Sequence, residues 1–190
     1  MKKYFLAFFV CAIFNCTLYS QVPNLLKKQT SALRIENQIK IDGTLSEAEW
    51  LTAKTATNFI QNTPIPSVAP TQKTEVKILY DNTALYIGAI LYDSHPDSIL
   101  NQLTERDDMG NADWFAIILD TYKDGNNGVG FVTTPSGVQL DIKYSAVSGR
   151  RGGGPGGVLS EGDRSWDAVW DAEARITETG WEVEMKIPYM

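Results

Sequence analysis

Cysteine and histidine are nearly absent from this chain of 190 residues. The two cysteines, Cys11 and Cys16, both lie near the start of the sequence. A chain that loses this segment can form neither a disulfide nor a thiolate metal site. His95 is the only histidine, and its position before Pro96 is typical of a surface loop. These counts exclude a histidine-based catalytic triad and a zinc site with several histidine ligands.

Positive charge is also scarce. The sequence has 17 lysine and arginine residues against 23 aspartate and glutamate residues, and its formal net charge is -6. Phosphate binding relies on clustered basic side chains, so the composition excludes a nucleic-acid partner. The one local basic pair, Arg150 and Arg151, lies in a glycine-rich stretch and is interpreted as a solvated loop tip.

Residues 1–20 have the layout of a secretory signal peptide. Two lysines precede an apolar run from Tyr4 to Phe14, and the small residue Ser20 ends the segment. A membrane-spanning helix needs about 20 continuous apolar residues, and Asn15 interrupts this run. Lipid attachment at Cys16 is disfavoured because Asn15 is not small. The leader predicts export to the periplasm, the outer membrane or the extracellular space.

The rest of the sequence is built from short segments with alternating polarity. Residues 21–35 are interpreted as a linker or edge segment, and Ser46–Ala53 as one helical turn with Trp50 pointing inward. The expected strands are Thr74–Tyr80, Ala84–Tyr92, Trp114–Leu119, Phe131–Thr134, Val138–Tyr144, Trp166–Ile176 and Trp181–Ile187. Many short strands without βαβ spacing predict an all-β fold, an antiparallel β-sandwich of the immunoglobulin or jelly-roll kind.

Two features of the second half refine this prediction. Residues 148–163 are rich in glycine, a composition typical of a flexible loop within the domain. In the last strand Glu182, Glu184 and Lys186 alternate with apolar residues, so all three are expected to face water.

Two separated motifs stand at the two ends of the predicted strands: Ile41–Gly43 with Glu47 and Trp50, and Gly180–Pro188. Together they resemble the family 9-like carbohydrate-binding modules of secreted bacterial proteins. The resemblance implies that residues 36–190 form such a module. It also implies a sandwich that is incomplete at its C-terminus and has an unpaired edge, because the family continues with further strands.

Further motifs resemble a subgroup in which the module precedes a long uncharacterised region similar to an outer-membrane β-barrel. These motifs are Arg106–Asp107, Asp113, Leu119–Thr121 with Asp124, and Pro135–Asp141. The resemblance implies two partners: a carbohydrate or glycan surface, and the chain's own C-terminal barrel.

The family's sugar site is largely missing from this sequence. Ala116 stands where the family has a glutamate, Val132 where it has an arginine, and Gly110 about where it has a stacking tryptophan. Sugar binding needs aromatic faces for apolar patches and planar polar groups for hydroxyls.

A relocated site would therefore draw on other residues. Trp114 and Trp166 are the aromatic candidates, and Arg106 and Asp107 are the polar ones. We expect Trp166→Ala and Arg106→Ala to weaken glycan binding without disturbing the fold. The other tryptophans, Trp50, Trp170 and Trp181, are in phase with apolar neighbours and are expected in the core.

Asp120, Asp124 and Asn126 place oxygen-bearing side chains around Gly125, a chemistry that suits calcium. Related modules carry structural calcium. The alternative is that these residues form a turn, a common role of aspartate and asparagine.

The resemblance implies a non-catalytic carbohydrate-binding module whose parent protein takes part in carbohydrate catabolism and O-glycosyl hydrolysis. The first alternative is an interaction or plug-like domain that packs on the C-terminal barrel and has lost the sugar site. The second is a glycosidase, which would need two carboxyl groups about 5 to 10 Å apart across a cleft. Asp107 with Asp113, or Glu182 with Glu184, could in principle supply the two carboxyl groups, but a charged outer face explains Glu182 and Glu184 without catalysis.

Overall fold

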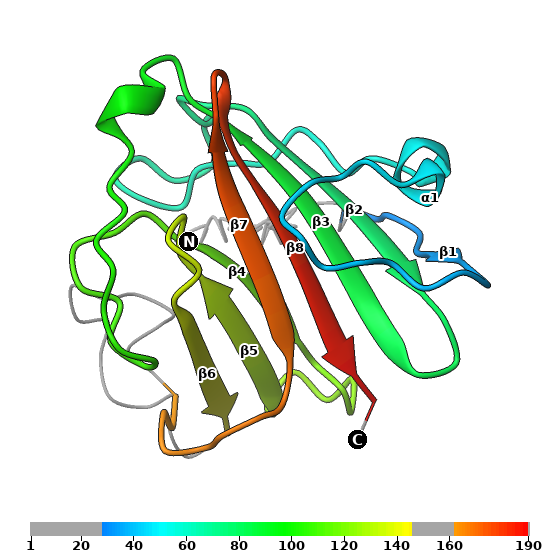
Figure 1. The fold of residues 1–190 in the computed structure, drawn as a ribbon. Helices are drawn as coiled ribbons and strands as arrows, with labels where there is room; N and C mark the ends of the chain where they lie inside the picture. Colours follow the sequence, from blue (N-terminus) through cyan, green and yellow to red (C-terminus); the bar gives the residue numbers. More distant parts are fainter. Residues whose placement is uncertain (1–27, 146–161, 190) are drawn as a thin grey trace, which may run out of the picture.

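The computed structural model describes residues 28–145 and 162–189, which form two packed β-sheets (Figure 1). The larger sheet contains, in spatial order, β1 (Leu33–Arg34), β2 (Thr74–Tyr80), β3 (Ala84–Tyr92), β8 (Gly180–Pro188) and β7 (Asp171–Thr177). The smaller sheet contains β4 (Phe115–Leu119), β5 (Gly128–Thr133) and β6 (Gln139–Tyr144). The all-β sandwich predicted from the sequence is confirmed.

Helical structure within these ranges is limited to α1 (Ala48–Thr52) and the 3-10 turn η1 (Pro96–Ser98). Neither is long and apolar enough to cross a membrane. The predicted leader at 1–20 and positions 148–161 of the predicted glycine-rich loop lie outside the described residues. β1 falls within the segment predicted as a linker or edge, and it pairs with β2 in parallel, whereas the other described pairs of strands are antiparallel.

The space between the sheets holds the main core. Ile87, Val183 and Met185 are fully buried there, and Phe131 packs edge-on against Trp170 with ring centroids 5.2 Å apart. Trp170 and Trp181 are each 4% exposed, so their predicted core positions are confirmed.

The outer face of the larger sheet is also covered, by the segment that precedes β2. Trp50 of α1 is fully buried and packs with Leu79 and Tyr86, which point outward from β2 and β3. Beneath it lies Gly88, where an added Cβ would stand 2.9 Å from Trp50 Cζ3, so a glycine is needed for the indole to approach the sheet.

This second covered face corrects the prediction for Glu184, which is completely buried. Its Oε2 accepts hydrogen bonds from the backbone N–H groups of Asp42, Gly43 and Thr44 at 2.9, 3.0 and 3.3 Å. Burial raises the pKa of Glu184, although hydrogen bonds from Asp42 N–H and the Trp50 indole act in the opposite direction. The carboxylate therefore binds the N-terminal segment to β8 instead of facing water.

The strand predicted from Trp166 to Ile176 is also shorter than expected. β7 begins at Asp171, and the preceding residues are not part of a sheet. The reason is local. The backbone N–H of Ala168 donates a hydrogen bond to the side chain of Asp141 over 2.7 Å, and so it does not pair with the backbone of a neighbouring strand.

Candidate functional site

A buried carboxylate, Asp141 of β6, lies where the smaller sheet meets the segment before β7. Asp141 pairs with Phe131 across β5 and β6, so its side chain points toward the inter-sheet space, and it is completely buried. Its Oδ1 accepts a hydrogen bond from Trp170 Nε1 at 2.5 Å. A buried carboxylate requires several such donors, since an unpaired one would carry a large desolvation penalty.

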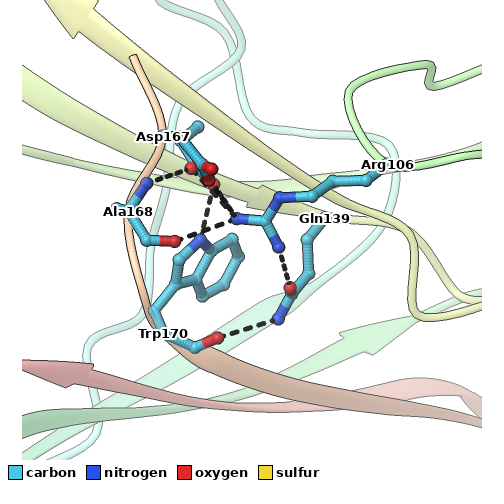
Figure 2. Close-up of polar contacts among 6 residues, drawn as sticks. Arg106, Gln139, Asp167, Ala168 and Trp170 are labelled. Carbon is cyan, nitrogen blue, oxygen red and sulfur yellow. Dashed lines mark hydrogen bonds and ion pairs between the residues drawn. The ribbon is translucent and has the colours of Figure 1, made fainter.

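Arg106 supplies the positive charge for this carboxylate. Its Nη2 lies 2.8 Å from Asp141 Oδ1 and also donates to the carbonyl of Ala168 over 3.1 Å. Its Nη1 donates to Gln139 Oε1 over 2.5 Å, and Gln139 Nε2 donates in turn to the Trp170 carbonyl over 3.4 Å (Figure 2). Arg106, which lies in the loop before β4, thereby connects this loop to β6 and to the segment that precedes β7.

The structure does not use Asp107 in this network. Its backbone N–H donates to the Gln139 carbonyl over 3.0 Å, and its φ of 66° places it in the left-handed region. Its side chain is exposed. The second acidic neighbour of Arg106 is instead Asp167, whose Oδ1 lies 3.6 Å from Nη2.

A polar cleft of about 550 Å³ opens beside this network. Gln139 and Trp170 belong to both the network and the cleft wall. Five further positions of β7, β8 and the β5–β6 turn complete one side, and two residues of the N-terminal segment complete the other: Asp171, Ala172, Glu173, Lys186, Gly137, Ile39 and Ile41. Asp171 and Lys186 are directly opposite each other in β7 and β8.

The two tryptophans proposed as a sugar platform lie on opposite faces of the smaller sheet. Trp166 is partly buried in the inter-sheet core and meets the inward-facing ring of Phe131 edge-on, with ring centroids 6.1 Å apart. Trp114 precedes the inward-facing Phe115, so it points outward, and it is 46% exposed. These two rings cannot sandwich one sugar.

In the turn proposed to bind calcium, the carboxylate oxygens accept hydrogen bonds from backbone N–H groups of the same turn. Asp120 Oδ2 accepts the Gly125 N–H over 2.8 Å, and Asp124 Oδ1 accepts the N–H groups of Asn126 and Asn127 over 2.8 and 2.9 Å. These hydrogen bonds hold the pKa of Asp124 below its usual value. Among the described residues no group of three or more histidine, cysteine, aspartate or glutamate side chains is placed to hold a metal ion. The geometry favours the turn-forming interpretation.

Comparisons with known proteins agree with the architecture. No family model matches the sequence, and neither does a curated protein. Among solved structures, a family 9 carbohydrate-binding module from Caldicellulosiruptor kristjanssonii in complex with cellotriose superposes with a TM-score of 0.54 and 15% identity. That match covers 83% of this chain and 67% of the other. A family 9 module from the same organism in complex with glucose gives a TM-score of 0.53 and 18% identity, and covers 82% and 69% of the two chains.

The chain has a family 9-like fold. Within this fold, Ala116 and Val132, two positions that the sequence resemblance assigned to sugar recognition, carry apolar side chains that pack together with Leu140. Ala116 pairs with Val132 across β4 and β5, and Val132 pairs with Leu140 across β5 and β6. Val132 and Leu140 are each 1% exposed. Neither Ala116 nor Val132 therefore offers a polar group to a sugar hydroxyl.

The position of Gly110 is similarly restricted. Its φ is 51°, and an added Cβ would lie 2.7 Å from Thr104 Cγ2 and 2.9 Å from Gln102 Oε1. A tryptophan at this position would require the loop to move. The family 9-like fold is therefore present, and Ala116, Val132 and Gly110 carry none of the polar or aromatic side chains that the sequence resemblance places at these positions.

Sequence reasoning missed the residues that line the cleft. Asp171, Glu173 and Lys186 were interpreted as the charged outer face of two alternating strands. Gln139 belongs to one of the motifs of the resemblance, but no binding role was assigned to it. Only the register of β7 against β8 places Asp171 opposite Lys186, and register is not visible in one sequence. The interruption of the apolar pattern of β6 by Asp141 was the available signal.

Proposed function

We propose that this chain is a non-catalytic carbohydrate-binding module and that the cleft beside the Arg106–Asp141 network is its sugar site. The observation that carries the proposal is the fold shared with two modules whose structures contain cellotriose and glucose. Fold alone does not specify a ligand, and the chemistry of the cleft provides the further support.

The cleft combines size and polarity in the way that a short sugar requires. Its volume of about 550 Å³ falls within the range of about 300–1,000 Å³ typical of small-ligand sites. The carboxylates of Asp171 and Glu173 accept hydrogen bonds from hydroxyl groups, and Lys186 donates them. Ile39 and Ile41 provide apolar contact for C–H groups. The carboxylates disfavour an anionic ligand, so a neutral, hydroxyl-rich sugar is the expected class.

Gln139 is oriented before any ligand arrives. Arg106 Nη1 fixes its oxygen at 2.5 Å and the Trp170 carbonyl holds its nitrogen at 3.4 Å. Each amide atom keeps one further hydrogen-bonding capacity. A side chain that is already ordered loses little entropy on binding, which supports a recognition role for Gln139.

The proposal includes export of the module, supported by the leader pattern at residues 1–20, and a role in carbohydrate catabolism outside the cytoplasm. Neither part depends on catalysis by this domain.

The test is isothermal titration of the chain with glucose and with cellotriose. We expect saturable binding of cellotriose and about tenfold weaker binding by Asp171→Asn and Glu173→Gln, because each removes a charge-assisted hydrogen bond. Glu178→Gln, in the β7–β8 turn outside the cleft, is the matched control and should bind like the original chain. A folded sample that binds neither sugar refutes the proposal. Binding that is lost in Trp114→Ala but kept in the cleft variants moves the site to the outer face of β4.

A second candidate function, an interaction domain of an envelope protein that has lost sugar binding, is favoured by the apolar side chains of Ala116 and Val132, which stand where the sequence resemblance places a glutamate and an arginine for sugar recognition. The barrel implied by the sequence resemblance is the proposed partner. Titration of a folded sample against a wide set of glycans separates the two candidates, since any saturable binding contradicts loss of the sugar site.

A further inference from the structure

One wall of the polar cleft belongs to neither sheet, because Ile39 and Ile41 of the N-terminal segment form it. Ile41 directly precedes the turn Asp42–Thr44, whose three backbone N–H groups all donate to Glu184 Oε2. In Figure 1 the blue segment before α1 crosses in front of β3 and reaches β8, the strand that carries Glu184. Within the described ranges, each hydrogen bond that joins residues 39–44 to the larger sheet ends on this carboxylate. One side chain of β8 therefore supplies the hydrogen bonds that position this wall.

The same carboxylate lies beside the opposite wall of the cleft. Glu184 is directly opposite Glu173 of β7 and two residues before Lys186 of β8, so the three side chains share one face of the sheet. Glu173 and Lys186 line the cleft. Glu184 is completely buried, so a sugar in the cleft does not contact it. Glu184 is thus placed to keep the two walls at a fixed separation without binding the ligand itself.

The turn also packs closely on β7. Gly43 has a φ of 78°, and an added Cβ would lie 3.3 Å from the carbonyl carbon of Ala174 and 3.4 Å from its nitrogen. A glycine is needed here both for the backbone conformation and for the close approach. Ala172 and Glu173, which line the cleft, immediately precede Ala174 in the strand. A small displacement of the turn would therefore change the shape of the cleft.

We propose that Glu184 is a positioning residue of the sugar site: its carboxylate holds the turn Asp42–Thr44, and the turn holds Ile39 and Ile41 where they contact the sugar. The inference rests on the proposed function, because it concerns the same cleft. When the turn is released from Glu184, the segment moves away from β7 and the cleft loses its apolar wall. Only folded molecules with the turn in place bind the sugar, so the apparent affinity falls in proportion to that fraction.

The first test is isothermal titration of Glu184→Gln with cellotriose. The substitution keeps the size of the side chain but removes the charge of the acceptor, and we expect about tenfold weaker binding, which corresponds to a turn in place in about one folded molecule in ten. Glu182→Gln removes a carboxylate of the same strand outside the cleft and should bind like the original chain. Unchanged affinity of Glu184→Gln overturns this inference alone, whereas a folded original chain that binds no sugar refutes the proposed function as well.

A loss of affinity is distinguished from a general loss of stability by a third variant. Val183→Ala changes the neighbouring residue of β8, which faces the inter-sheet core, and should lower stability without disturbing the N-terminal segment. Each variant is titrated well below its unfolding midpoint, so that only folded molecules are compared. Val183→Ala should then bind cellotriose within about twofold of the original chain. If it loses as much affinity as Glu184→Gln, the carboxylate contributes stability alone and the inference is wrong.

A pair of glycine variants tests the turn without altering any carboxylate, and it decides the question even where Glu184→Gln does not fold. Gly43→Ala places a methyl group against the backbone of Ala174 and should displace the turn, so we expect cellotriose binding to weaken at least about threefold. Gly125→Ala is the matched control, because Gly125 has a similar φ of 67°, no atom within 4 Å of its added Cβ and no place in the cleft wall. It should bind like the original chain. Equal affinities of the two glycine variants contradict a wall positioned by the turn.

Discussion

Trp50 Nε1 donates a hydrogen bond to Glu184 Oε1 over 3.0 Å, and this contact connects two sequence motifs that are 134 residues apart. The same carboxylate accepts the backbone N–H groups of Asp42 and Gly43, so one side chain of β8 fixes both the turn and the helix of the N-terminal motif. The two motifs that make this sequence resemble family 9-like modules therefore form a single structural unit.

Replacing this carboxylate should be severely destabilising. Glu184→Ala leaves three backbone N–H groups and the Trp50 indole without their acceptor in a buried position. We expect the free energy of unfolding in urea to fall by about 3–5 kcal/mol. Glu182→Ala, on the same face of the same strand but paired with Arg175 at the surface, is the control and should lose less than about 1 kcal/mol. Equal losses in the two variants would mean that the buried hydrogen bonds do not hold the N-terminal segment.

Glu184 also shows where sequence reasoning reaches its limit. Alternation in β8 correctly separates Val183 and Met185, which face the inter-sheet core, from Glu184 on the opposite face. The prediction assumed that one face of the sheet containing β8 is exposed to solvent, as it is in many antiparallel sheets. Here the N-terminal segment covers the second face, and such long-range packing leaves no trace in the local polarity pattern. The hairpins were predictable because their turn residues, such as Asp81, lie beside the strands that they connect.

Arg106→Ala should destabilise the fold, contrary to the expectation from the sequence that it would leave the fold intact. The substitution leaves the completely buried Asp141 without its charged partner, whose Nη2 lies 2.8 Å away. We expect a loss of about 2–4 kcal/mol in the free energy of unfolding. Arg175→Ala removes a comparable arginine from an exposed pair with Glu182 and should cost less than about 1 kcal/mol. If both variants unfold at the same urea concentration, Arg106 is not a structural residue and its assignment to ligand binding regains support.

The candidate site was only partly predictable, because the sequence shows local motifs but not the long-range packing that brings them together. Arg106 and Asp141 both belong to motifs that carry the sequence resemblance, but their pairing depends on how the loop before β4 packs on β6, which the sequence does not show. Trp114 and Trp166 were grouped by residue type, whereas the structure places Trp114 on the outer face of the smaller sheet and packs Trp166 against Phe131 on its inner face. A sequence indicates which chemistry is available, and only the strand register shows which groups meet.

Calcium should not stabilise this chain. The carboxylates of Asp120 and Asp124 already accept hydrogen bonds from the backbone of their own turn, and calcium binding would have to break these contacts. We expect the thermal unfolding midpoint to be the same in calcium and in EDTA. An increase of the midpoint with calcium that disappears in Asp124→Asn would establish the metal site that the sequence suggested and overturn the turn-forming interpretation.

Asp81 should make stability sensitive to acid. Burial raises the pKa of Asp81, but hydrogen bonds from Thr83, Ala84 and Tyr86 outweigh it and lower the pKa from 3.8 to about 2. Because the folded state binds this proton less readily than the unfolded state, the stabilisation is fully present above the unfolded pKa and is lost as pH falls through the folded pKa. Asp81→Asn should therefore be less stable than the original chain at neutral pH, and the difference should shrink as pH falls from 3.8 toward about 2.

The hydroxyl of Tyr86 provides a control for this effect, because it donates to Asp81 Oδ2 over 2.9 Å while Thr83 and Ala84 bind Oδ1. Tyr86→Phe removes one of these donors and should retain most of the acid sensitivity. Burial and the hydrogen bond to Asp81 raise the pKa of Tyr86 to about 12. The stability of the original chain should therefore decline as pH rises from 10 toward about 12, and Tyr86→Phe should not show this decline. Urea unfolding at a series of pH values measures both windows. A constant difference between Asp81→Asn and the original chain across the acid range would show that the carboxylate does not act through its ionised form.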